Sequence, residues 1–565
     1  MKSLPTLLAV VLLTVAARAQ TPAPVFDVRT YGAKGDGTTL DTPAINAAID
    51  AAAKQGGGTV FFPAGNYLSY SIHLQSHVAL YLGIGSTIVA AEPSADLSVG
   101  YDAPEPTAGP AGTDQFEDFG HSHWHNSLIW GENLTDIAIT GPGRIFGRGL
   151  SRGHHAWRRD LLPEERKPGG NSFDEGDRPE IALPAAAIAA IAAQPKMPFN
   201  YPGKDTLPAG VGNKAIALKN CRNVIFRDFT LFHAGHFAIL ATGVDNWTCD
   251  NLKIDTNRDG IDFDCCQNVR VSNCTVNSPY DDGICPKASF GLGQVRPTEN
   301  VTITNCQVSG FAEGTLLDGT RQHMAGSLGG IGRIKLGTEA NGGFHNITIS
   351  NCVFEYCRGL ALEEVDGGLM EDIAISNITM RDISNAPIYI RLGARLRGPA
   401  PIAVGTARRI KIDNVVVHNA PAVHGVILLG VPGHPIEDLS LTHIFIDFAG
   451  GGAAEQAKRE VPDDEKAQRG YPEPAFHGTM PAWGLFARHV KNLDLSRVEF
   501  RVAQPDLRPV VHLEDVAGVT FDAVTFPRTV GVPVLVLKDV TNLDVHHSQG
   551  LPETSSSGPI VDKQL

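Results

Sequence analysis

The sequence predicts an all-β protein, folded as a right-handed, single-stranded parallel β-helix with an N-terminal helical cap. The main observation is a short motif of alternating apolar residues that recurs from about residue 130 onward. No segment with helical periodicity separates these repeats, which argues against a doubly wound sheet. With 565 residues the chain also exceeds the size of a usual single core, so it consists of several domains or of a repeat fold.

The first 19 residues have the pattern of a secretory signal peptide. Met1-Lys2 is followed by an apolar stretch from Leu4 to Val15 and then by Ala17-Arg18-Ala19, an A-x-A cleavage pattern. The apolar stretch is too short to span a membrane comfortably, and no later stretch reaches that length. We therefore expect a cleaved signal over residues 1–19 and a secreted or periplasmic protein that does not bind a membrane.

Residues 20–70 are expected to form the N-terminal cap. Asp41 or Thr42 can begin a helix, Pro43 suits its first turn, and Gly56-Gly57-Gly58 ends it before a strand that starts at Thr59. The apolar stripe of this helix consists of Ile45, Ala48, Ile49 and Ala52. A repeat fold needs such a cap to protect its open end.

Residues 71–545 are expected to form the parallel β-helix. The motif begins with Asn or Asp and continues with alternating apolar residues, as in Asn223-Val224-Ile225-Phe226, Asn268-Val269-Arg270-Val271 and Asn346-Ile347-Thr348-Ile349. Such alternation is typical of half-buried strands, and the many Gly and Pro residues suit short strands joined by turns.

Two inserts interrupt the repeats, near residues 150–213 and 449–482. The first is rich in charges and Pro and contains the Ala-rich stretch Leu183 to Ala193, which is expected to be helical. Long excursions on a solenoid often wall a binding groove, so both inserts are candidates for closing such a groove and favouring attack at a chain end. Residues 546–565 form a tail, which we expect to be disordered from Pro552 to Leu565.

Nine cysteines lie in the middle third of the chain. Several follow Asn at the same place in the motif, as in Asn273-Cys274 and Asn305-Cys306. A cysteine at a repeated position packs like a small apolar residue, so we favour core cysteines over a disulfide framework, which remains the alternative after export. No cysteine spacing resembles a zinc site.

Three carboxylates are the strongest candidates for a functional site. Asp259 lies in Asn257-Arg258-Asp259-Gly260, and Asp281-Asp282 follow 22 and 23 residues later, about one coil of a β-helix. Stacked coils would place them about 4.8 Å apart along the axis. Their mutual repulsion should raise at least one pKa, so the patch can hold a proton donor and a base. Taken singly, each motif reads as a turn, but their one-coil separation favours a site.

The N-terminal residues and the acidic motifs together resemble a known family. The segments Phe26-Asp27-Val28, Tyr31 to Gly37 and Phe62-Pro63-Ala64-Gly65 resemble the cap of polygalacturonase-like, pectin-lyase-like β-helix enzymes. The acidic motifs are similar to those of glycoside hydrolase family 28, the polygalacturonase and rhamnogalacturonase-like pectin hydrolases. Lys287 stands where many members carry Lys after the acidic pair.

The resemblance implies a catalytic domain over residues 71–545 and inverting hydrolysis of glycosidic bonds in pectin. By this resemblance Asp281 would be the general acid, while Asp259 and Asp282 would hold and deprotonate the attacking water. No cofactor and no metal is expected. A cluster at His121-Ser122-His123-Trp124-His125 suggests metal binding, but no carboxylate set is fixed around it.

The sequence departs from the family pattern at two places where the family has basic or histidine residues. Glu313 replaces the histidine of a Gly-His-Gly motif, and Glu363 and Glu364 stand where a substrate-gripping Arg-Ile-Lys would follow Arg358-Gly359-Leu360. A literal Arg333-Ile334-Lys335 lies upstream and is a candidate for the same task. Replacing a cation by Glu363 repels a uronate, so we expect a neutral or less acidic sugar there, with rhamnogalacturonan as the obvious candidate.

Further candidates for substrate binding come from the coils around the acidic motifs. These are Asn257, Lys287, Glu313, Glu363, His236, Arg333, Lys335 and Arg391. His236 lies one coil before Asp259 and is equally well a structural histidine. Arg391 and Arg395 are candidates for the missing substrate cations, and exposed salt bridges are the competing reading for both.

The sequence therefore predicts a secreted glycoside hydrolase acting on a pectic polysaccharide or oligosaccharide of the galacturonan or rhamnogalacturonan type. A formal net charge of -14 argues against a nucleic-acid binder, and we expect a monomer. Two alternatives stay open. One is a β-helix polysaccharide lyase, in which the acids bind calcium and an Arg or Lys acts as base. The other is a non-catalytic carbohydrate-binding solenoid.

Overall fold

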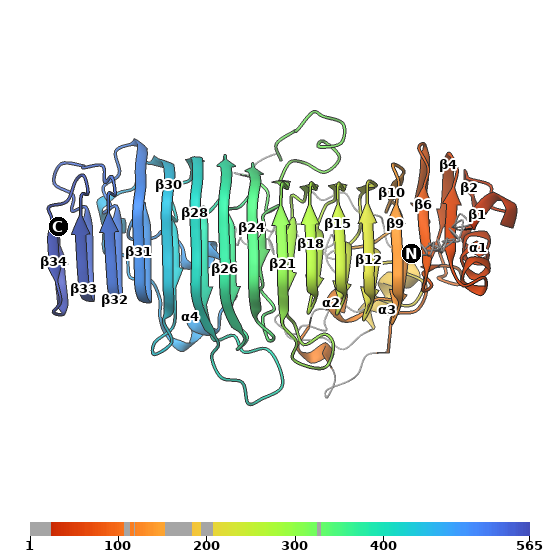
Figure 1. The fold of residues 1–565 in the computed structure, drawn as a ribbon, viewed down its shortest axis with the longest axis horizontal. Coiled ribbons are helices and arrows are strands. Elements are labelled where there is room, and N and C mark those ends of the chain that lie inside the picture. Colours follow the sequence, from red (N-terminus) through yellow and green to blue (C-terminus); the bar gives the residue numbers. More distant parts are fainter. Residues whose placement is uncertain (1–23, 107–112, 118, 153–183, 194–206, 325–328) are drawn as a thin grey trace, which may run out of the picture.

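The protein is a single long solenoid (Figure 1). A computed structural model describes residues 24–106, 113–117, 119–152, 184–193, 207–324 and 329–565. The expected signal peptide and most of the 150–213 insert lie outside these residues. In the described part of the insert, helix α3 (Ala185–Ala192) confirms the helix predicted for the Ala-rich stretch. Within the described ranges no helix has both the length and the apolar character needed to cross a membrane.

The solenoid is built from coils whose strands pair in parallel with the coils before and after them, which confirms the predicted right-handed parallel β-helix. One face carries the predicted motif repeats. Its strands are β9 (Thr135–Thr140), β12 (Arg222–Arg227), β15 (Asp245–Asp250), β18 (Gln267–Ser272), β21 (Thr298–Thr304), β24 (Phe344–Glu355), β26 (Leu369–Arg381), β28 (Thr406–Ala420), β30 (Ile436–Gly450), β31 (Leu485–Gln504), β32 (Val511–Asp522) and β33 (Leu535–His546). In the earlier coils a second face follows, with β10 (Arg144–Phe146), β13 (Thr230–Phe232), β16 (Lys253–Asp255), β19 (Thr275–Asn277) and β22 (Gln307–Ser309).

A third face completes each coil, and its strands position the candidate site. It begins with the six-stranded sheet of β5 (Ile72–His73), β8 (Ser127–Glu132), β11 (Lys214–Lys219), β14 (Phe237–Thr242), β17 (Asp259–Asp264) and β20 (Ile284–Lys287). A bridge from Ile284 to Ile334 leads on to β23 (Lys335–Leu336), β25 (Leu360–Glu364), β27 (Ile388–Leu392) and β29 (Val426–Leu429).

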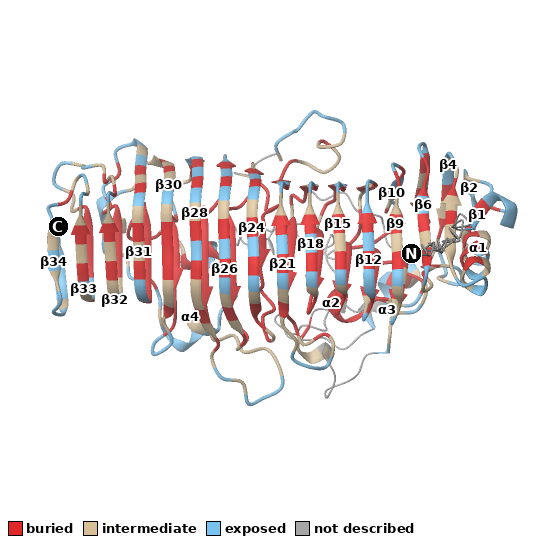
Figure 2. Ribbon diagram, in the orientation of Figure 1, coloured by how far each residue is buried: buried red, intermediate tan, exposed pale blue. Residues whose placement is uncertain are grey.

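The asparagines of the motif shape the corners of the coils. Asn223, Asn246 and Asn268 have left-handed φ angles of 58°, 52° and 59°, which Asn adopts more readily than most residues. Their side chains also stack between coils, since Asn246 Nδ2 donates to Asn223 Oδ1 at 3.2 Å. After each corner the strand alternates buried and exposed positions (Figure 2). The buried ones, such as Val224 and Val269, align between coils in one core.

The helix predicted within residues 20–70 is present. Helix α1 (Thr42–Lys54) lies at the N-terminal end of the solenoid with β1 (Val25–Asp27), β2 (Asp36–Leu40), β3 (Gly58–Phe62), β4 (Gly65–Ser69), β6 (Val78–Leu82) and β7 (Ser86–Ala90) (Figure 1). The predicted apolar stripe of α1 is fully buried. Asp41 precedes the helix, but its carboxylate accepts hydrogen bonds from the backbone of Lys34 at 2.7 Å and Gly35 at 2.9 Å. Asp41 thus ties a preceding loop to the helix start.

The prediction of a disordered C-terminal tail is wrong. Strands β34 (Thr554–Ser556) and β35 (Ile560–Gln564) pair antiparallel with β33, the last long strand of the solenoid. An uncovered final strand would leave its backbone N–H and C=O groups without partners, and the tail supplies them.

All nine cysteines are free and buried, as the core interpretation expects. Cys274, Cys306 and Cys352 follow the corner asparagines in successive coils and belong to the continuous core.

Candidate active site

The three aspartates lie at one corner of the solenoid because the third-face strands begin there. Phe237, the first residue of β14, pairs with Asp259, the first residue of β17. Ile261 pairs with Ile284 in β20, so Asp282 occupies the same place one coil further on. Carboxylate oxygens of Asp259, Asp281 and Asp282 lie within 4.8 Å of one another. The structure thus brings together the three residues that the sequence selects.

Burial separates the three carboxylates. Asp259 and Asp282 are buried, whereas the side chain of Asp281 is 25% exposed. Arg258 lies between two of them, with its Nε 3.0 Å from Asp281 Oδ2 and 3.6 Å from Asp259 Oδ2. Arg258 also contacts His236, whose Nδ1 lies 2.7 Å from the carbonyl oxygen of Arg152. Asp281 is therefore the acid of this patch that a sugar can approach most easily.

Asp282 is held as a carboxylate by two basic residues from the next coil. Arg333 Nε lies 2.9 Å from Asp282 Oδ1, and Lys335 Nζ lies 3.0 Å from Asp282 Oδ2. Burial alone would raise the pKa of Asp282, but the charges of Lys335 and Arg333 outweigh it and hold this pKa well below its usual range. Asp282 is ionised at neutral pH.

Asp259 has the opposite character. Burial, followed by the negative charges of Asp281 and Asp262, raises the pKa of Asp259 well above its ordinary value. The predicted rise in at least one pKa is thus present. The patch therefore combines a carboxyl whose pKa is raised with one whose pKa is lowered, within a few ångströms of each other.

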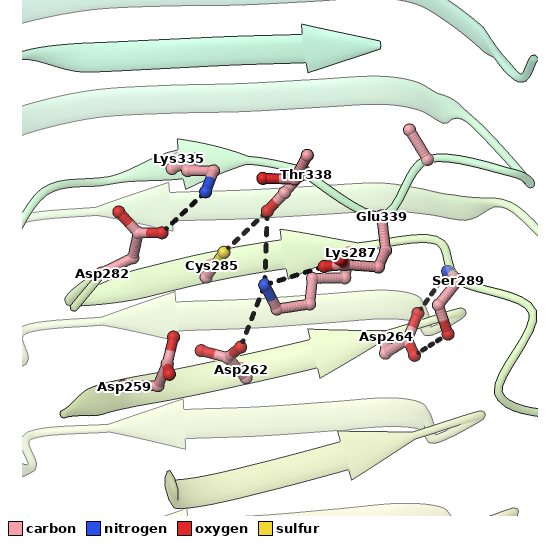
Figure 3. Close-up of polar contacts among 12 residues, drawn as sticks. Asp259, Asp262, Asp264, Asp282, Cys285, Lys287, Ser289, Lys335, Thr338 and Glu339 are labelled. Atoms are coloured by element: carbon pink, nitrogen blue, oxygen red, sulfur yellow. Dashed lines mark hydrogen bonds and ion pairs between the residues drawn. The ribbon is translucent and has the colours of Figure 1, made fainter. Parts of the chain in front are cut away.

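A second buried group of charges lies beside the aspartates on the outer side of β17 and β20 (Figure 3). Lys287 Nζ lies 3.5 Å from Asp262 Oδ2 and 3.3 Å from Glu339 Oε2. Burial raises the pKa of Asp262 to about 8, and Lys287 offsets this in part. Lys287 thus lies beside the aspartates, where its Nζ contacts the carboxylates of Asp262 and Glu339 and the carbonyl oxygen of Gly337.

The second insert reaches the site. We call residues 459–482 the strap; it contains α4 (Glu465–Arg469) and α5 (Pro474–His477). Glu473 Oε2 lies 2.9 Å from Arg333 Nη2 and 2.9 Å from Arg358 Nη1. The hydroxyl of Tyr471 lies 3.4 Å from Lys335 Nζ. The strap thus packs against the residues that hold Asp282.

Glu363 joins the same cluster. Its carboxylate is fully buried and lies 3.7 Å from Arg333 Nη2 and 3.6 Å from Lys335 Nζ. Burial raises the pKa of Glu363 to about 7, while Lys335 and Arg333 oppose the rise. Arg333 and Lys335 therefore do reach the acidic patch, although the cluster also contains the glutamate that the sequence places at the family's basic position.

The other predicted binding residues differ in how they relate to the aspartates. His236 reaches them through Arg258. Asn257 is fully buried, and neither side-chain atom has a hydrogen-bond partner among the described residues. Glu313 lies 3.0 Å from His233 Nδ1, and Arg391 donates to the carbonyl oxygens of Gly430 and Ala467. In the part of the chain that the structure describes, Glu313 and Arg391 form no hydrogen bond or ion pair with the aspartates.

Sequence reasoning missed several charged residues of the site. Asp262 alternates with the apolar residues Ile261 and Phe263 along β17, a pattern typical of an outward, solvated position, yet the residue is completely buried. Glu339 and Glu473 gave no local signal, because their partners lie 52 and 140 residues away in the chain. Arg258 was the exception: it stands inside the Asn257–Gly260 motif, where its proximity could have been inferred.

The spacing of the three aspartates would also suit a cation, but the surrounding charges do not favour one. Arg258, Arg333 and Lys335 already neutralise these carboxylates at ion-pair distance. A divalent cation would have to displace or approach three basic groups, which is costly in a buried site. The arrangement therefore fits proton transfer better than metal binding.

Comparisons with known proteins point to carbohydrate-active β-helices. A family model described as rhamnogalacturonase A/epimerase, pectate lyase-like, matches residues 25–93. An exo-poly-alpha-D-galacturonosidase of Dickeya chrysanthemi is 28% identical over 306 residues, covering 52% of this chain and 47% of that protein. A probable polygalacturonase of Vitis vinifera is 25% identical over 362 residues, covering 62% of this chain and 60% of that protein. The chain spans between about half and three fifths of the length of these relatives.

The fold has a close counterpart among solved structures. A family 28 exopolygalacturonase of Yersinia enterocolitica superposes with a TM-score of 0.59 and 19% sequence identity. The match covers 89% of this chain and 79% of that one. At this identity the similarity concerns the architecture, which agrees with the parallel β-helix described above.

Proposed function

We propose that the protein is an exported glycoside hydrolase that cleaves glycosidic bonds in a pectic polysaccharide or oligosaccharide. The observation that carries the proposal is the patch of Asp259, Asp281 and Asp282, in which a carboxyl with a raised pKa lies beside one with a lowered pKa. The similarity to proteins named as galacturonan-cleaving enzymes supports the class of substrate.

Hydrolysis requires one group that protonates the leaving oxygen and another that takes a proton from water. Burial and the charge of Asp281 raise the pKa of Asp259, so Asp259 can supply a proton to the patch, and Asp281 is the residue exposed enough to protonate the leaving oxygen. Asp282, kept ionised by Arg333 and Lys335, orients the water and takes up its proton. Return of that proton to the Asp259–Asp281 pair restores the enzyme for the next turnover.

The stereochemical course is a separate part of the proposal. The resemblance to family 28 implies inversion, yet the nearest carboxylate oxygens lie within 4.8 Å, below the roughly 6.5–9.5 Å that inverting glycosidases generally show between their carboxyls. Proton NMR of the first product shows whether the anomeric configuration is inverted or retained. A product with the opposite anomeric configuration supports inversion, and a retained configuration contradicts inversion while leaving hydrolysis intact.

The function is tested by incubating the protein with galacturonan, rhamnogalacturonan and their oligomers, with and without a chelator. Reducing ends and unsaturated uronates are followed together. The proposal expects new reducing ends, no unsaturated product and no effect of the chelator. Chelator-sensitive unsaturated product would instead establish a lyase, and the absence of product from every pectic substrate would favour a non-catalytic binding protein.

The lyase alternative has one supporting observation, the position of Arg258 beside Asp281 and Asp259. A lyase base has to be free to abstract a proton, whereas Arg258 is fully charged at neutral pH and ion-paired with two carboxylates. The hydrolase is therefore the stronger proposal.

The strap supports attack near a chain end. It packs against Arg333 and Lys335, on the side of Asp282 that leads toward the C-terminal coils. A polymer lying along the third face would meet the strap there. Early release of short products without a fall in polymer viscosity would support end attack, and a rapid fall in viscosity would contradict it.

A further inference from the structure

Lys214 is a buried cation in line with the catalytic aspartates. It begins β11 and pairs with Phe237, which pairs in turn with Asp259. Two steps between adjacent strands correspond to about 9.6 Å along the solenoid axis. Lys214 therefore lies on the N-terminal side of the acidic patch, at the equivalent place two coils earlier.

The surroundings of Lys214 do not neutralise it. The residue is 0% exposed, and its Nζ donates to Asn213 Oδ1 at 2.8 Å. Among the described residues no carboxylate lies within ion-pair distance of this Nζ. Burial lowers the pKa of Lys214 to about 7, and the charge of Glu105 offsets this only in part. A buried charge normally has an oppositely charged partner, so this position points to an anionic ligand.

Other buried polar groups near Lys214 lack hydrogen-bond partners among the described residues. Both ring nitrogens of His121 and both amide atoms of Asn126 are buried without a hydrogen-bond partner among the described residues. The backbone carbonyl oxygen of Asn126 accepts the backbone N–H of Asn213 at 2.8 Å, and the charge of Lys214 acts on His121. Buried polar atoms are rarely left without partners, so they indicate a polar ligand that bonds to several groups.

The opposite side of the aspartates has a balanced set of charges. There the cations Arg333, Lys335 and Arg358 face the carboxylates of Asp282, Glu363 and Glu473. Each cation is already engaged at ion-pair distance, and the strap contributes Glu473. A further carboxylate from a substrate would meet repulsion from Glu363 and Glu473.

We propose that Lys214 binds the carboxylate of a uronic acid on the N-terminal side of the aspartates, and that the balanced cluster on the C-terminal side receives a neutral sugar. The inference rests on the proposed function and narrows its substrate. The favoured glycan has uronate on one side of the cleaved bond and a neutral sugar on the other. Such an order occurs in a chain that alternates acidic and neutral residues.

The test is a binding cycle measured by titration calorimetry, which does not depend on cleavage. The ligands are a short rhamnose–galacturonate oligomer, the same oligomer with methyl-esterified uronates, and a galacturonate oligomer of equal length. The proteins are the wild type, Lys214→Met and Lys214→Arg, with Lys253→Met as a control at an exposed lysine on β16. Thermal melting and circular dichroism confirm that each variant folds.

For the wild type and the control we expect esterification to weaken binding at least tenfold. Lys214→Met should bind the acidic oligomer at least tenfold more weakly and respond no further to esterification, while Lys214→Arg keeps the response. An equal effect of esterification in the wild type and in Lys214→Met overturns the proposal, because no coupling then links the lysine to the carboxylate. Failure of the wild type to bind the acidic oligomer overturns it as well.

The neutral side is tested with Glu473→Gln, which removes the charge but keeps the shape of the side chain. Its control is Glu465→Gln, on the same strap, whose ion-pair partner among the described residues is Arg469, four residues further along α4. We expect Glu473→Gln to improve binding of the galacturonate oligomer relative to the alternating oligomer at least fivefold. An unchanged ratio of the affinities for the two oligomers contradicts the proposal that the C-terminal side receives a neutral sugar. Binding that follows these rules without any hydrolysis would refute the proposed function and not the assignment of Lys214.

Discussion

Replacing Lys214 by Met should make the protein more stable at and below neutral pH. Lys214 is completely buried, with the amide of Asn213 as its hydrogen-bond partner. Its pKa falls from 10.5 to about 7 on folding. At about 1.4 kcal/mol per pKa unit, holding the proton on Lys214 in the folded state costs up to about 5 kcal/mol. Methionine fills a similar volume and carries no charge, so the variant avoids this cost.

The effect has a defined pH dependence. Below about pH 7 Lys214 is protonated in both the folded and the unfolded chain, and the full cost is present. Between pH 7 and 10.5 the unfolded chain binds more protons, so the stability of the wild type rises with pH. Above pH 10.5 the lysine is neutral in both states and the advantage of Lys214→Met disappears. Glu105 is the charged group that partly offsets the cost, while burial keeps His121 and His236 neutral.

The measurement is the difference in thermal midpoint between Lys214→Met and the wild type, taken at several values between pH 6 and pH 10. We expect the variant to melt higher at pH 6 and the difference to shrink steadily toward zero. The control Lys253→Met should show no such trend. A variant that melts lower than the wild type at pH 6, or a difference that does not change with pH, would refute the reasoning that Lys214 is a buried cation without a counter-charge.

Four other predictions follow from the site and from the core of the solenoid. Asp281→Asn should lower kcat on the best pectic substrate by about two to four orders of magnitude, as loss of a general acid does, while Asp539→Asn on β33 leaves it unchanged; an equal loss in both variants would point to general destabilisation. Arg333→Met should lower the free energy of unfolding, measured with urea, by about 3–5 kcal/mol, because it removes an ion-pair partner from the buried Asp282 and Glu473. Arg321→Met breaks an exposed pair with Glu355 and should lower it by less than about 1 kcal/mol. Similar losses for the two arginines would contradict the buried network. A thiol reagent should label none of the nine cysteines in the folded protein and all nine in urea, and labelling of fewer than nine after unfolding would reveal disulfides. Prolonged treatment with a chelator should leave both activity and thermal midpoint unchanged, and a loss that calcium restores would show that the aspartates hold a metal.

The solenoid was predictable because its determinants repeat. Each coil needs a corner residue with a left-handed φ and a strand with alternating burial, and the motif supplies both, as at Asn223 and Val224. The same repetition allowed the acidic site to be found, since a separation of one coil becomes direct proximity in space. The tail was mispredicted because Thr554–Ser556 has no apolar pattern; its order comes from pairing with β33.

The charges around the aspartates could not be derived in the same way. Glu473 lies in an insert without periodicity, and its partner Arg333 stands 140 residues earlier in the chain. Lys214 begins a strand, where a lysine usually extends into solvent, yet it is completely buried, and its strand pattern does not indicate this. A separation of one coil in the sequence predicts which residues are neighbours along the solenoid axis. It does not predict which residues of an insert contact them.

The central claim is that the aspartates cleave a glycosidic bond with water, and oxygen-isotope labelling tests it most directly. The wild-type protein and Asp281→Asn are incubated with a rhamnose–galacturonate oligomer in water enriched in heavy oxygen, and the products are analysed by mass spectrometry. We predict that the wild type incorporates one heavy oxygen at each new reducing end and that the variant yields almost no product. Products without the label that carry an unsaturated uronate would show elimination and contradict the account.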